Sequence, residues 1–473
     1  MKARLSPLIS GALALAFVGH SSAQAMDLAQ AYRDALANDT IVASTRAQLE
    51  ATRERVPQAR AGLLPAINGS MVVNRQMVDT NLAPRRDFTS QNYSVNMTYP
   101  LYRLQNVETF EQSKLQVLIS EAALAQAQQD LAVRVSQAYF DVLAAQDNLA
   151  TIRAQKRAIS EQLASARRNF EVGTATITDQ QEAQSRFDLA VAQEFVAIND
   201  LAVKRAALSQ LVGKPTGELQ VLRKGLTLDS PTPAVEREWT ENARQNSLLV
   251  QQARVGVEVA RREIEKQRYG HRPTVDLVST LGQSRSAAVN FLGVVSNAAT
   301  LGVQVAIPIY AGGAVDARVR EAASLRDKAE SDLENVRRQV EQSARQSYLG
   351  VNSGLAQVRA LEAAERSSQL ALDSNLLGYQ VGVRINIDVL NAQQQLFNTQ
   401  RDLAKARYDV LLNSLRLKFS NAALSEADLQ ALAALLETPV GDPTEPPPAP
   451  STGNTQVTPV APRPARIPGG RGG

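Results

Sequence analysis

The sequence predicts a mainly α-helical protein with membrane-spanning β-strands, built from two tandem structural repeats. Three observations support this fold class. Motifs recur at a nearly constant offset, long stretches without proline carry a helical pattern, and short segments alternate between apolar and polar residues. Helical patterns this long exceed ordinary helix lengths and cannot be buried in a globule, so we expect an elongated molecule.

The tandem repeat rests on motifs that match between the two halves. Tyr99-Pro100-Leu101-Tyr102 corresponds to Ile307-Pro308-Ile309-Tyr310, an offset of 308 − 100 = 208. Gly173 corresponds to Gly382, an offset of 382 − 173 = 209. An offset that stays almost constant along the chain indicates a duplication.

The chain is expected to divide into six segments. In order, they are a signal peptide (1–25), a first repeat of helix, strand hairpin and long helical hairpin (26–212), a linking equatorial segment (213–238), a second repeat (239–420), a C-terminal equatorial segment (421–437) and a disordered tail rich in proline and glycine (438–473).

The N-terminus carries the pattern of a secretory signal peptide. Lys2 and Arg4 precede an apolar run over 8–18, and small residues follow, so cleavage is expected between Ala25 and Met26. The run is too short to span a membrane as a helix. We therefore expect an exported protein.

One helix is expected over 27–62, with Asp27 as its cap and Pro65 beyond its end. Strict alternation then predicts strands, because successive side chains of a strand point to opposite faces. Outer loops are expected at 80–90 and 284–298. The four alternating segments are 67–74, 92–100, 274–281 and 300–307.

Two structures fit this alternation. One is an antiparallel sheet on a soluble core, and the other is a transmembrane barrel with lipid outside and water inside. Export, the flanking long helices and the placement of Tyr93 and Tyr99 favour the barrel. Four strands cannot close a useful bore, and open strand edges are forbidden in lipid, so several chains must share one barrel.

The remaining helices form two pairs, each a longer helix followed by a shorter one. The pattern predicts helices over 104–170 and 174–211, and again over 318–379 and 385–419. Each pair turns at a glycine, Gly173 or Gly382. The last helix is expected to start at Asp388 and to pack through aliphatic residues seven apart. Those residues are Val389, Leu396, Leu403, Val410 and Leu417.

Composition excludes several classes of function. The 51 basic and 47 acidic residues are interspersed, which argues against nucleic-acid binding. The absence of cysteine excludes disulfides and thiol catalysis. His271 is expected to end a helix rather than to belong to a catalytic triad. We predict no enzyme activity, no catalytic residue, no cofactor and no metal site.

These motifs resemble the TolC family of outer-membrane channel-tunnel proteins over essentially the whole mature chain. The resemblance rests on Leu63-Leu64-Pro65, Tyr99-Pro100-Leu101-Tyr102 and the two Val-Gly…Asp hairpins, supported by a collar-like segment at 424–432. It implies a homotrimer in the outer membrane. Its strands would form one barrel in the lipid, and its helices one periplasmic tunnel closed at the far tip.

The resemblance also implies a pore constriction at the second hairpin. Asp388 matches an acidic residue that rings the pore entrance in the family, and Asn391 stands where TolC has a second acidic residue. One ring of carboxylates instead of two should attract cations less strongly. Without the resemblance, Asp388 could equally be a helix N-cap.

The family further implies a latch of polar links between neighbouring hairpins. Tyr379 and Arg384 match its donors, and Thr178 and Asp179 match its acceptors. We expect these links to hold the closed state until an inner-membrane partner binds.

The resulting functional hypothesis is an exit duct for type I protein secretion. It would receive a toxin-like polypeptide of the RTX or cyclolysin type from an inner-membrane ABC exporter and a periplasmic adaptor. One alternative is the outer-membrane channel of a tripartite drug-efflux pump. Another is an exported structural coiled-coil protein whose alternating segments are soluble hairpins.

Overall fold

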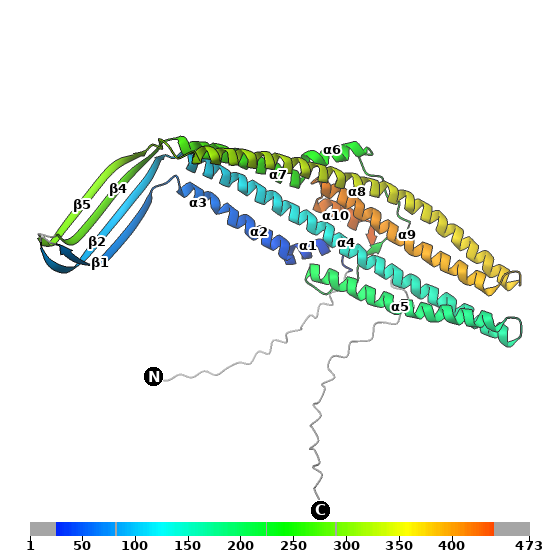
Figure 1. Cartoon of the computed structure of the whole chain (residues 1–473). Coiled ribbons are helices and arrows are strands. Elements are labelled where there is room, and N and C mark those ends of the chain that lie inside the picture. The colour runs from blue at the N-terminus through cyan, green and yellow to red at the C-terminus, as the bar shows by residue number, and fades with distance from the viewer. Residues whose placement is uncertain (1–24, 81–82, 224, 289–290, 439–473) are drawn as a thin grey trace, which may run out of the picture.

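The computed structural model describes residues 25–80, 83–223, 225–288 and 291–438. The molecule is elongated, with a curved sheet at one end and long helices that run to the opposite end (Figure 1). Residues 1–24, which hold most of the expected signal peptide, and the tail from residue 439 onward lie outside the described residues.

The sheet has four antiparallel strands in the order β1-β2-β4-β5. Each repeat contributes one hairpin, and β2 pairs with β4 to join them. Within the described residues, the outer edges of β1 and β5 pair with no other strand. The strands are β1 (Ala66–Thr80), β2 (Ala83–Tyr102), β4 (Thr274–Ala288) and β5 (Phe291–Ala306).

The prediction of outer loops at 80–90 and 284–298 was wrong, because the strands continue through both segments. The ladders run on to Thr80 opposite Ala83 and to Ala288 opposite Phe291. Asp87, one of the charged residues in the segment predicted as a loop, pairs across the strands instead: it accepts a hydrogen bond from Arg75 Nε at 3.0 Å. Opposite charges on facing strands stabilise a hairpin, so charge here does not end the strand.

The single helix expected over 27–62 is three helices. Asp39 accepts a hydrogen bond from the Val42 N–H at 2.8 Å and therefore caps a new helix. Pro57 has no N–H to donate to the Arg53 carbonyl, which explains the second break at Glu54. Asp27 caps the first helix as expected. The three helices are α1 (Leu28–Asn38), α2 (Thr40–Arg53) and α3 (Arg55–Ala61).

Two helices run the length of the helical part. α4 (Leu104–Glu171) has 68 residues and α8 (Ala314–Gln380) has 67. At a rise of 1.5 Å per residue each is about 100 Å long. α5 (Ile177–Val212) returns along α4, and α9 (Asn386–Ser420) returns along α8.

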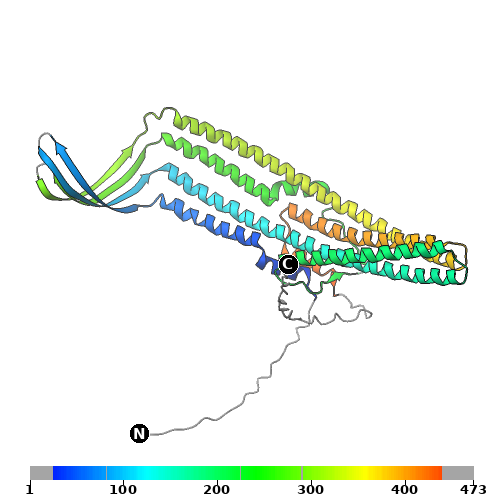
Figure 2. The same ribbon diagram turned by 60° about the horizontal axis from the view of Figure 1, so that its bottom comes forward.

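The helices form a wall one layer thick. Near the sheet, α2 and α3 lie beside α4, which lies beside α7 (Leu248–Arg268) and then α8. Figure 2 shows this order near the sheet. Toward the tips, the order is α5, α4, α9 and α8 (Figure 1). The shorter helices thus follow one another end to end, while α4 and α8 hold the two halves of the wall together.

A collar lies midway along the wall. It contains α6 (Glu236–Asn246), α10 (Glu426–Ala433) and a small sheet of β3 (Val221–Leu222) with β6 (Leu436–Glu437). The largest buried cluster lies here and includes Tyr139, Phe140 and Tyr408, with the last two rings stacked at 5.7 Å.

The expected cleavage site also lies at the collar. Ala25 and Met26 are buried, and Met26 pairs with Leu219 as an isolated parallel bridge. The Tyr139 hydroxyl donates to the Met26 carbonyl at 2.9 Å. Burial raises the pKa of Tyr139, so it stays a donor at all physiological pH values.

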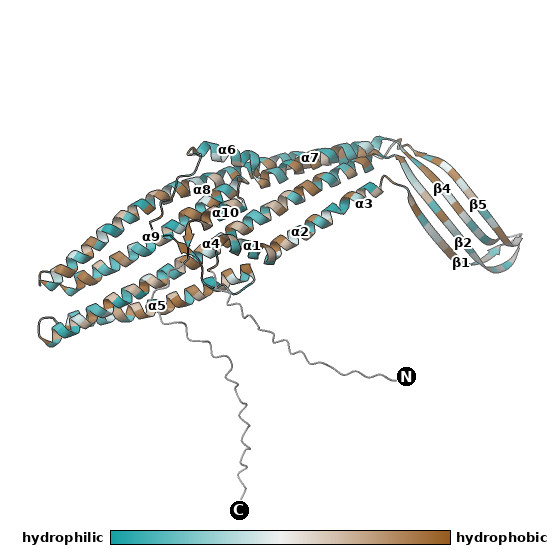
Figure 3. Cartoon of the chain, turned by 180° about the vertical axis from the view of Figure 1, so that it is seen from behind, coloured by the Kyte–Doolittle hydropathy of each residue, from teal (hydrophilic) through white to brown (hydrophobic). Residues whose placement is uncertain are grey.

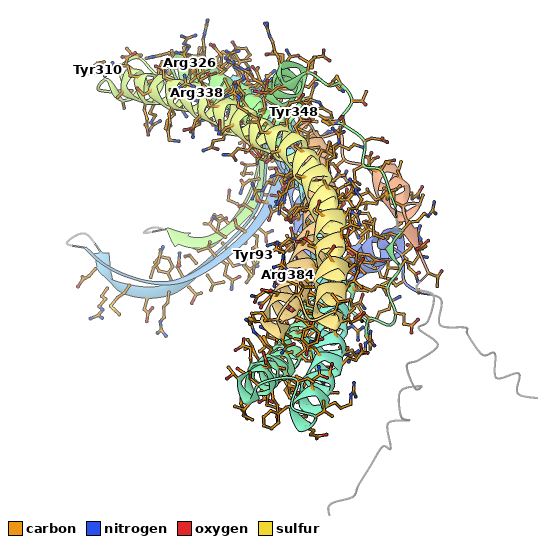
Figure 4. The ribbon with its side chains drawn as sticks, turned by 90° about the vertical axis from the view of Figure 1, so that its right-hand side faces the viewer. Tyr93, Tyr310, Arg326, Arg338, Tyr348 and Arg384 are labelled. Carbon is orange, nitrogen blue, oxygen red and sulfur yellow. The ribbon has the colours of Figure 1, made fainter. Side chains whose placement is uncertain are left out.

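At the junction of sheet and helices, Arg103 donates to both carboxylate oxygens of Asp276, at 2.8 and 2.6 Å, and so fixes the start of α4 to β4. His271, in the short helix η1 (Tyr269–His271), contacts Asp316 at 3.1 Å. Tyr310, just before α8, is 88% exposed. Figure 4 shows Tyr310 at this end of the second repeat and Arg384 at the other.

No described helix combines the length and the apolarity that a membrane crossing requires. Hydrophilic and hydrophobic residues are intermixed along every long helix (Figure 3). This mixture fits a wall in which each helix buries one stripe against its neighbours and exposes the rest.

Candidate functional site

The tips of the two helical hairpins bring most of the predicted site residues to one end of the molecule. In the first hairpin, Gly173 has a φ of +79°, which closes the turn after α4. Thr176 and Asp179 then form a capping box at the start of α5: the Asp179 N–H donates to the Thr176 hydroxyl oxygen at 3.2 Å, and the Thr176 N–H donates to the Asp179 carboxylate at 3.0 Å. Asp179 is therefore engaged within its own hairpin.

The second hairpin turns in the same way at Gly382, whose φ is +80°. Its second helix, α9, begins at Asn386 and follows Ile385, which has no side-chain oxygen for a cap. Asp388 is the third residue of α9, so it neither starts nor caps that helix. Its carboxylate lies 3.6 Å from Arg384 Nη1.

A buried amide pair joins the two hairpins within one chain. Gln162 Nε2 donates to Asn386 Oδ1 at 2.5 Å, and Asn386 Nδ2 donates to the Asp179 backbone carbonyl at 3.1 Å. Asn386 is 1% exposed and Gln162 is 6% exposed. Buried hydrogen bonds of this kind are costly to lose, because each partner would be left unpaired.

Apolar contacts support the amide pair. Leu390 of α9 packs into a cluster that belongs to the first hairpin. Its neighbour Val389 faces the other way, toward Leu372 and Leu396 in the contact between α8 and α9. Successive residues of α9 thus contact both hairpins. The first-hairpin cluster consists of Ile159, Leu163, Ala166, Ala183 and Ala190.

Arg186 forms a second polar bridge, from α5 to α9. Its Nη2 donates to Asn391 Oδ1 at 3.3 Å, its Nη1 donates to Gln394, and its Nε donates to Glu182 at 3.0 Å. The guanidinium therefore has a partner at each nitrogen. Asn391, predicted as part of the pore constriction, is exposed on its other side.

The predicted latch residues do not meet within one chain. The Tyr379 hydroxyl accepts a hydrogen bond from Asn169 Nδ2 at 3.1 Å. Among the described residues of a single chain, no hydrogen bond or ion pair joins Tyr379 or Arg384 to Thr178 or Asp179. Links between neighbouring chains remain a prediction.

Sequence reasoning missed Gln162, Asn386, Asn169 and Arg186. One signal was available: Asn386 and Gln393 are polar, lie seven residues apart and are both buried on α9. A polar residue repeated at a heptad position indicates a specific contact. Nothing in the local pattern indicates which helix supplies the partner.

A buried link ties the two hairpins together nearer the collar. The Tyr408 hydroxyl on α9 donates to Asp147 on α4 at 2.6 Å. Burial raises the pKa of both groups, and in Asp147 the hydrogen bond from Tyr408 opposes part of that effect. The hairpins are thus joined at both ends of their shared length.

Between these two links lies a groove of about 560 Å³ bounded by α4, α5 and α9. Its lining mixes polar and apolar side chains. They include Gln155, Leu189, Val196, Phe397, Asn398 and Arg401.

The family model described as "Outer membrane efflux protein" matches residues 31–214 and again residues 239–422. The two matches are offset by 239 − 31 = 208, the offset of the repeated motifs. The matched residues make up most of the chain.

Curated relatives match along nearly the whole chain. Outer membrane protein TolC of Vibrio cholerae is 33% identical over 92% of this chain and 99% of its own length. Alkaline protease secretion protein AprF of Pseudomonas aeruginosa is 32% identical over 91% of both chains. Proteases secretion protein PrtF of Dickeya chrysanthemi is 32% identical over 87% of this chain and 92% of its own.

Solved structures share the fold at lower identity. CusC aligns with a TM-score of 0.74 and 17% identity over 85% of this chain and 95% of its own. VceC of Vibrio cholerae aligns with a TM-score of 0.73 and 17% identity over 84% and 96%. The similarity excludes the alternative of an exported structural coiled-coil protein. This chain belongs to the outer membrane efflux protein family of TolC-like channels, which are non-enzymatic transport channels of the outer membrane with a helical part in the periplasm.

Proposed function

We propose that this chain is the outer-membrane exit duct of a type I protein secretion system. It would pass a polypeptide from an inner-membrane ABC exporter and a periplasmic adaptor to the outside. The observation that carries the proposal is the match to AprF and PrtF, both named for protease secretion, at 32% identity over more than 90% of their lengths. A toxin-like cargo of the RTX or cyclolysin type is the narrower form of the same proposal.

The duct is proposed to be a homotrimer. β1 and β5 are open edges, and unpaired edges cannot face lipid, so other copies must complete the barrel. The helical wall is likewise open at α5 and α8, and both helices expose apolar side chains outside the groove. These include Phe195 and Val203 on α5, and Leu370 and Leu377 on α8.

The pore constriction is proposed to form at the hairpin tips, around Asp388 and Asn391. The free face of α9 is polar along its length, as the wall of a water-filled duct must be. It carries Asp388, Asn391, Gln395, Asp402, Lys405 and Asp409. In the trimer, Tyr379 and Arg384 would latch this tip to Thr178 and Asp179 of neighbouring hairpins.

The groove between α5 and α9 is the proposed docking place of the adaptor. It is long, lies on the helical part and mixes amides with apolar side chains such as Leu189 and Phe397. Such a surface suits a helical partner that buries one apolar stripe in a groove.

The second candidate is the outer-membrane channel of a drug-efflux pump. The description of the matching family model names efflux, and outer membrane efflux protein BepC of Brucella suis is 26% identical over 87% of this chain. We rank this function second, because the efflux relative has a lower sequence identity to this chain than the secretion relatives have.

A gene deletion assayed twice separates the two candidates. We expect the deleted strain to lose one secreted polypeptide from the medium and to keep its resistance to dyes and detergents. Drug hypersensitivity with normal secretion would establish the efflux function instead. A plasmid copy of the gene should restore whichever property is lost.

A further inference from the structure

The arginine that bridges α5 and α9 lies next to the proposed constriction. Arg186 donates to Asn391 and Gln394 on α9 and to Glu182 on its own helix. Its side chain is 28% exposed, so the charge is partly desolvated and is held in a fixed place. A fixed charge of this kind acts on ions near it more strongly than a mobile surface charge.

The charges around this site cancel in pairs. Asp388 lies 3.6 Å from Arg384, and Glu182 lies 3.0 Å from Arg186. These two pairs sum to no net charge in each chain. A ring of Asp388 carboxylates alone would give the pore entrance a negative charge. The structure, however, places Arg384 beside Asp388 and Arg186 beside Asn391.

We propose that Arg186 sets the ion preference of the duct by making its entrance electrically neutral. The inference rests on the proposed pore entrance at Asp388 and Asn391. With Arg186 in place, chloride should enter about as readily as potassium, and acidic segments of a transported polypeptide should meet no net repulsion. Without Arg186, three uncompensated Glu182 carboxylates would favour cations.

The test is the reversal potential of the full-length protein in planar bilayers under a potassium chloride gradient. We expect the permeability ratio of potassium to chloride in the unaltered protein to lie within about twofold of one. Arg186→Gln should raise that ratio about threefold or more, because it removes the positive charge and keeps a hydrogen-bonding side chain. Arg186→Lys should leave it nearly unchanged, because the charge remains although the three-way bridge is lost.

Asn391→Asp provides an independent variant. Alone it should raise the ratio about as much as Arg186→Gln does, because each change leaves one uncompensated carboxylate in every chain. Combined with Arg186→Gln it should raise the ratio further, because two carboxylates per chain would then be uncompensated. Arg167→Gln is the matched control, because Arg167 donates to Gln184 within the first hairpin, and no hydrogen bond or ion pair joins it to α9 among the described residues.

The outcomes separate the inference from the proposed function. A conducting channel whose reversal potential is the same with and without Arg186 would overturn the inference and leave the duct intact. Intact trimers that fail to conduct even when Tyr379→Phe and Arg384→Ser remove the proposed latch would contradict the duct, and the inference with it. A shift in Arg186→Lys as large as in Arg186→Gln would show that the bridge acts through its shape and not through its charge, which also overturns the inference.

Discussion

The two helical hairpins turn alike but differ in how their second helices begin. Gly173 and Gly382 have φ values of +79° and +80°. At the start of the next helix, however, Ile385 replaces Thr176, an offset of 385 − 176 = 209. Asp179 is therefore held in a capping box, while its counterpart Asp388 has no cap to join and pairs with Arg384.

The difference shows how a duplicated element can divide two roles. The first hairpin uses its acidic residue to stabilise a helix, and the second presents the same residue at the tip. The donors proposed for the latch also occur only in the second hairpin. Tyr379 and Arg384 correspond to Phe170 and Ala175, since 379 − 170 = 209 and 384 − 175 = 209.

The largest effect should follow from removing the two proposed latch donors from the second hairpin. Tyr379→Phe with Arg384→Ser removes the hydroxyl that contacts Asn169 and the guanidinium that contacts Asp388. We expect a several-fold rise in single-channel conductance in planar bilayers, because each loss occurs in every chain of the proposed trimer. Arg168→Ser, an exposed change at the other hairpin tip, is the control, and equal conductance in the two variants would contradict the latch.

The buried amide pair should give the next largest effect. Asn386→Ala leaves the Gln162 amide buried without a partner, which costs about 1–3 kcal/mol of local stability at the tip. Hydrogen exchange of the residues around both turns should speed up accordingly. Replacing both Gln162 and Asn386 by leucine removes both polar groups and should restore most of the protection from hydrogen exchange. If the double variant exchanges as fast as Asn386→Ala, the pair stabilises the tip through its shape and not through its hydrogen bond.

Much of this architecture was predictable, and the exceptions have physical causes. The repeat offset of 208–209 residues, together with the long stretches that lack proline, predicted the ends of the four long helices to within a few residues. The breaks at Asp39 and Glu54 were missed because a cap and a proline at the third position look harmless within a helical pattern. The strands beyond residue 80 were missed because Pro84, Arg85, Arg86 and Asp87 suggested a loop, and the pairing of Asp87 with Arg75 is visible only in the structure.

The contacts between the two hairpins could not be predicted from the sequence. Gln162 and Asn386 lie 224 positions apart, and nothing local selects one as the partner of the other. Arg186 likewise resembles any surface arginine beside Glu182 until α9 is placed against α5. Periodicity shows which face of a helix is buried, but only the three-dimensional packing shows against which neighbour.

Removing the capping residue of the first hairpin and adding one to the second tests this difference directly. Thr176→Val should destabilise the first hairpin by about 1 kcal/mol, because it removes the capping box. Ile385→Thr should stabilise the second by about 0.5–1 kcal/mol and draw Asp388 away from Arg384, because Ile385 is 62% exposed and contributes little to the core. Hydrogen exchange at the two turns should move in opposite directions, and movement in the same direction would refute the assignment of the caps.

The smallest effect concerns pH. Glu194 of the first hairpin contacts Lys156 at 2.7 Å, whereas its counterpart in the second is the buried Leu403 (403 − 194 = 209). The hydrogen bond from Lys156 holds the pKa of Glu194 below its usual value. A lowered pKa in the folded state means that the stabilisation is present above the unfolded pKa of about 4.3 and is lost as pH falls through the folded pKa.

Acid should therefore loosen the middle of the first hairpin more than that of the second, by about 0.5 kcal/mol at this partly exposed site. Hydrogen exchange at pH 7 and pH 3.5, corrected for intrinsic rates, measures the difference. Glu194→Gln should abolish it, and a difference that persists in this variant would assign the effect to another group.

The open edges of β1 and β5 also constrain the order of events during biogenesis. A lone sheet cannot enter lipid, whereas the exposed apolar side chains of α5 and α8 can associate in water. Assembly of the helical wall in the periplasm should thus come first, with the strands kept out of the bilayer until the copies of the proposed trimer are together. Insertion then becomes a single late step, and a chain that fails to find partners remains a substrate for periplasmic proteases rather than a leak in the membrane.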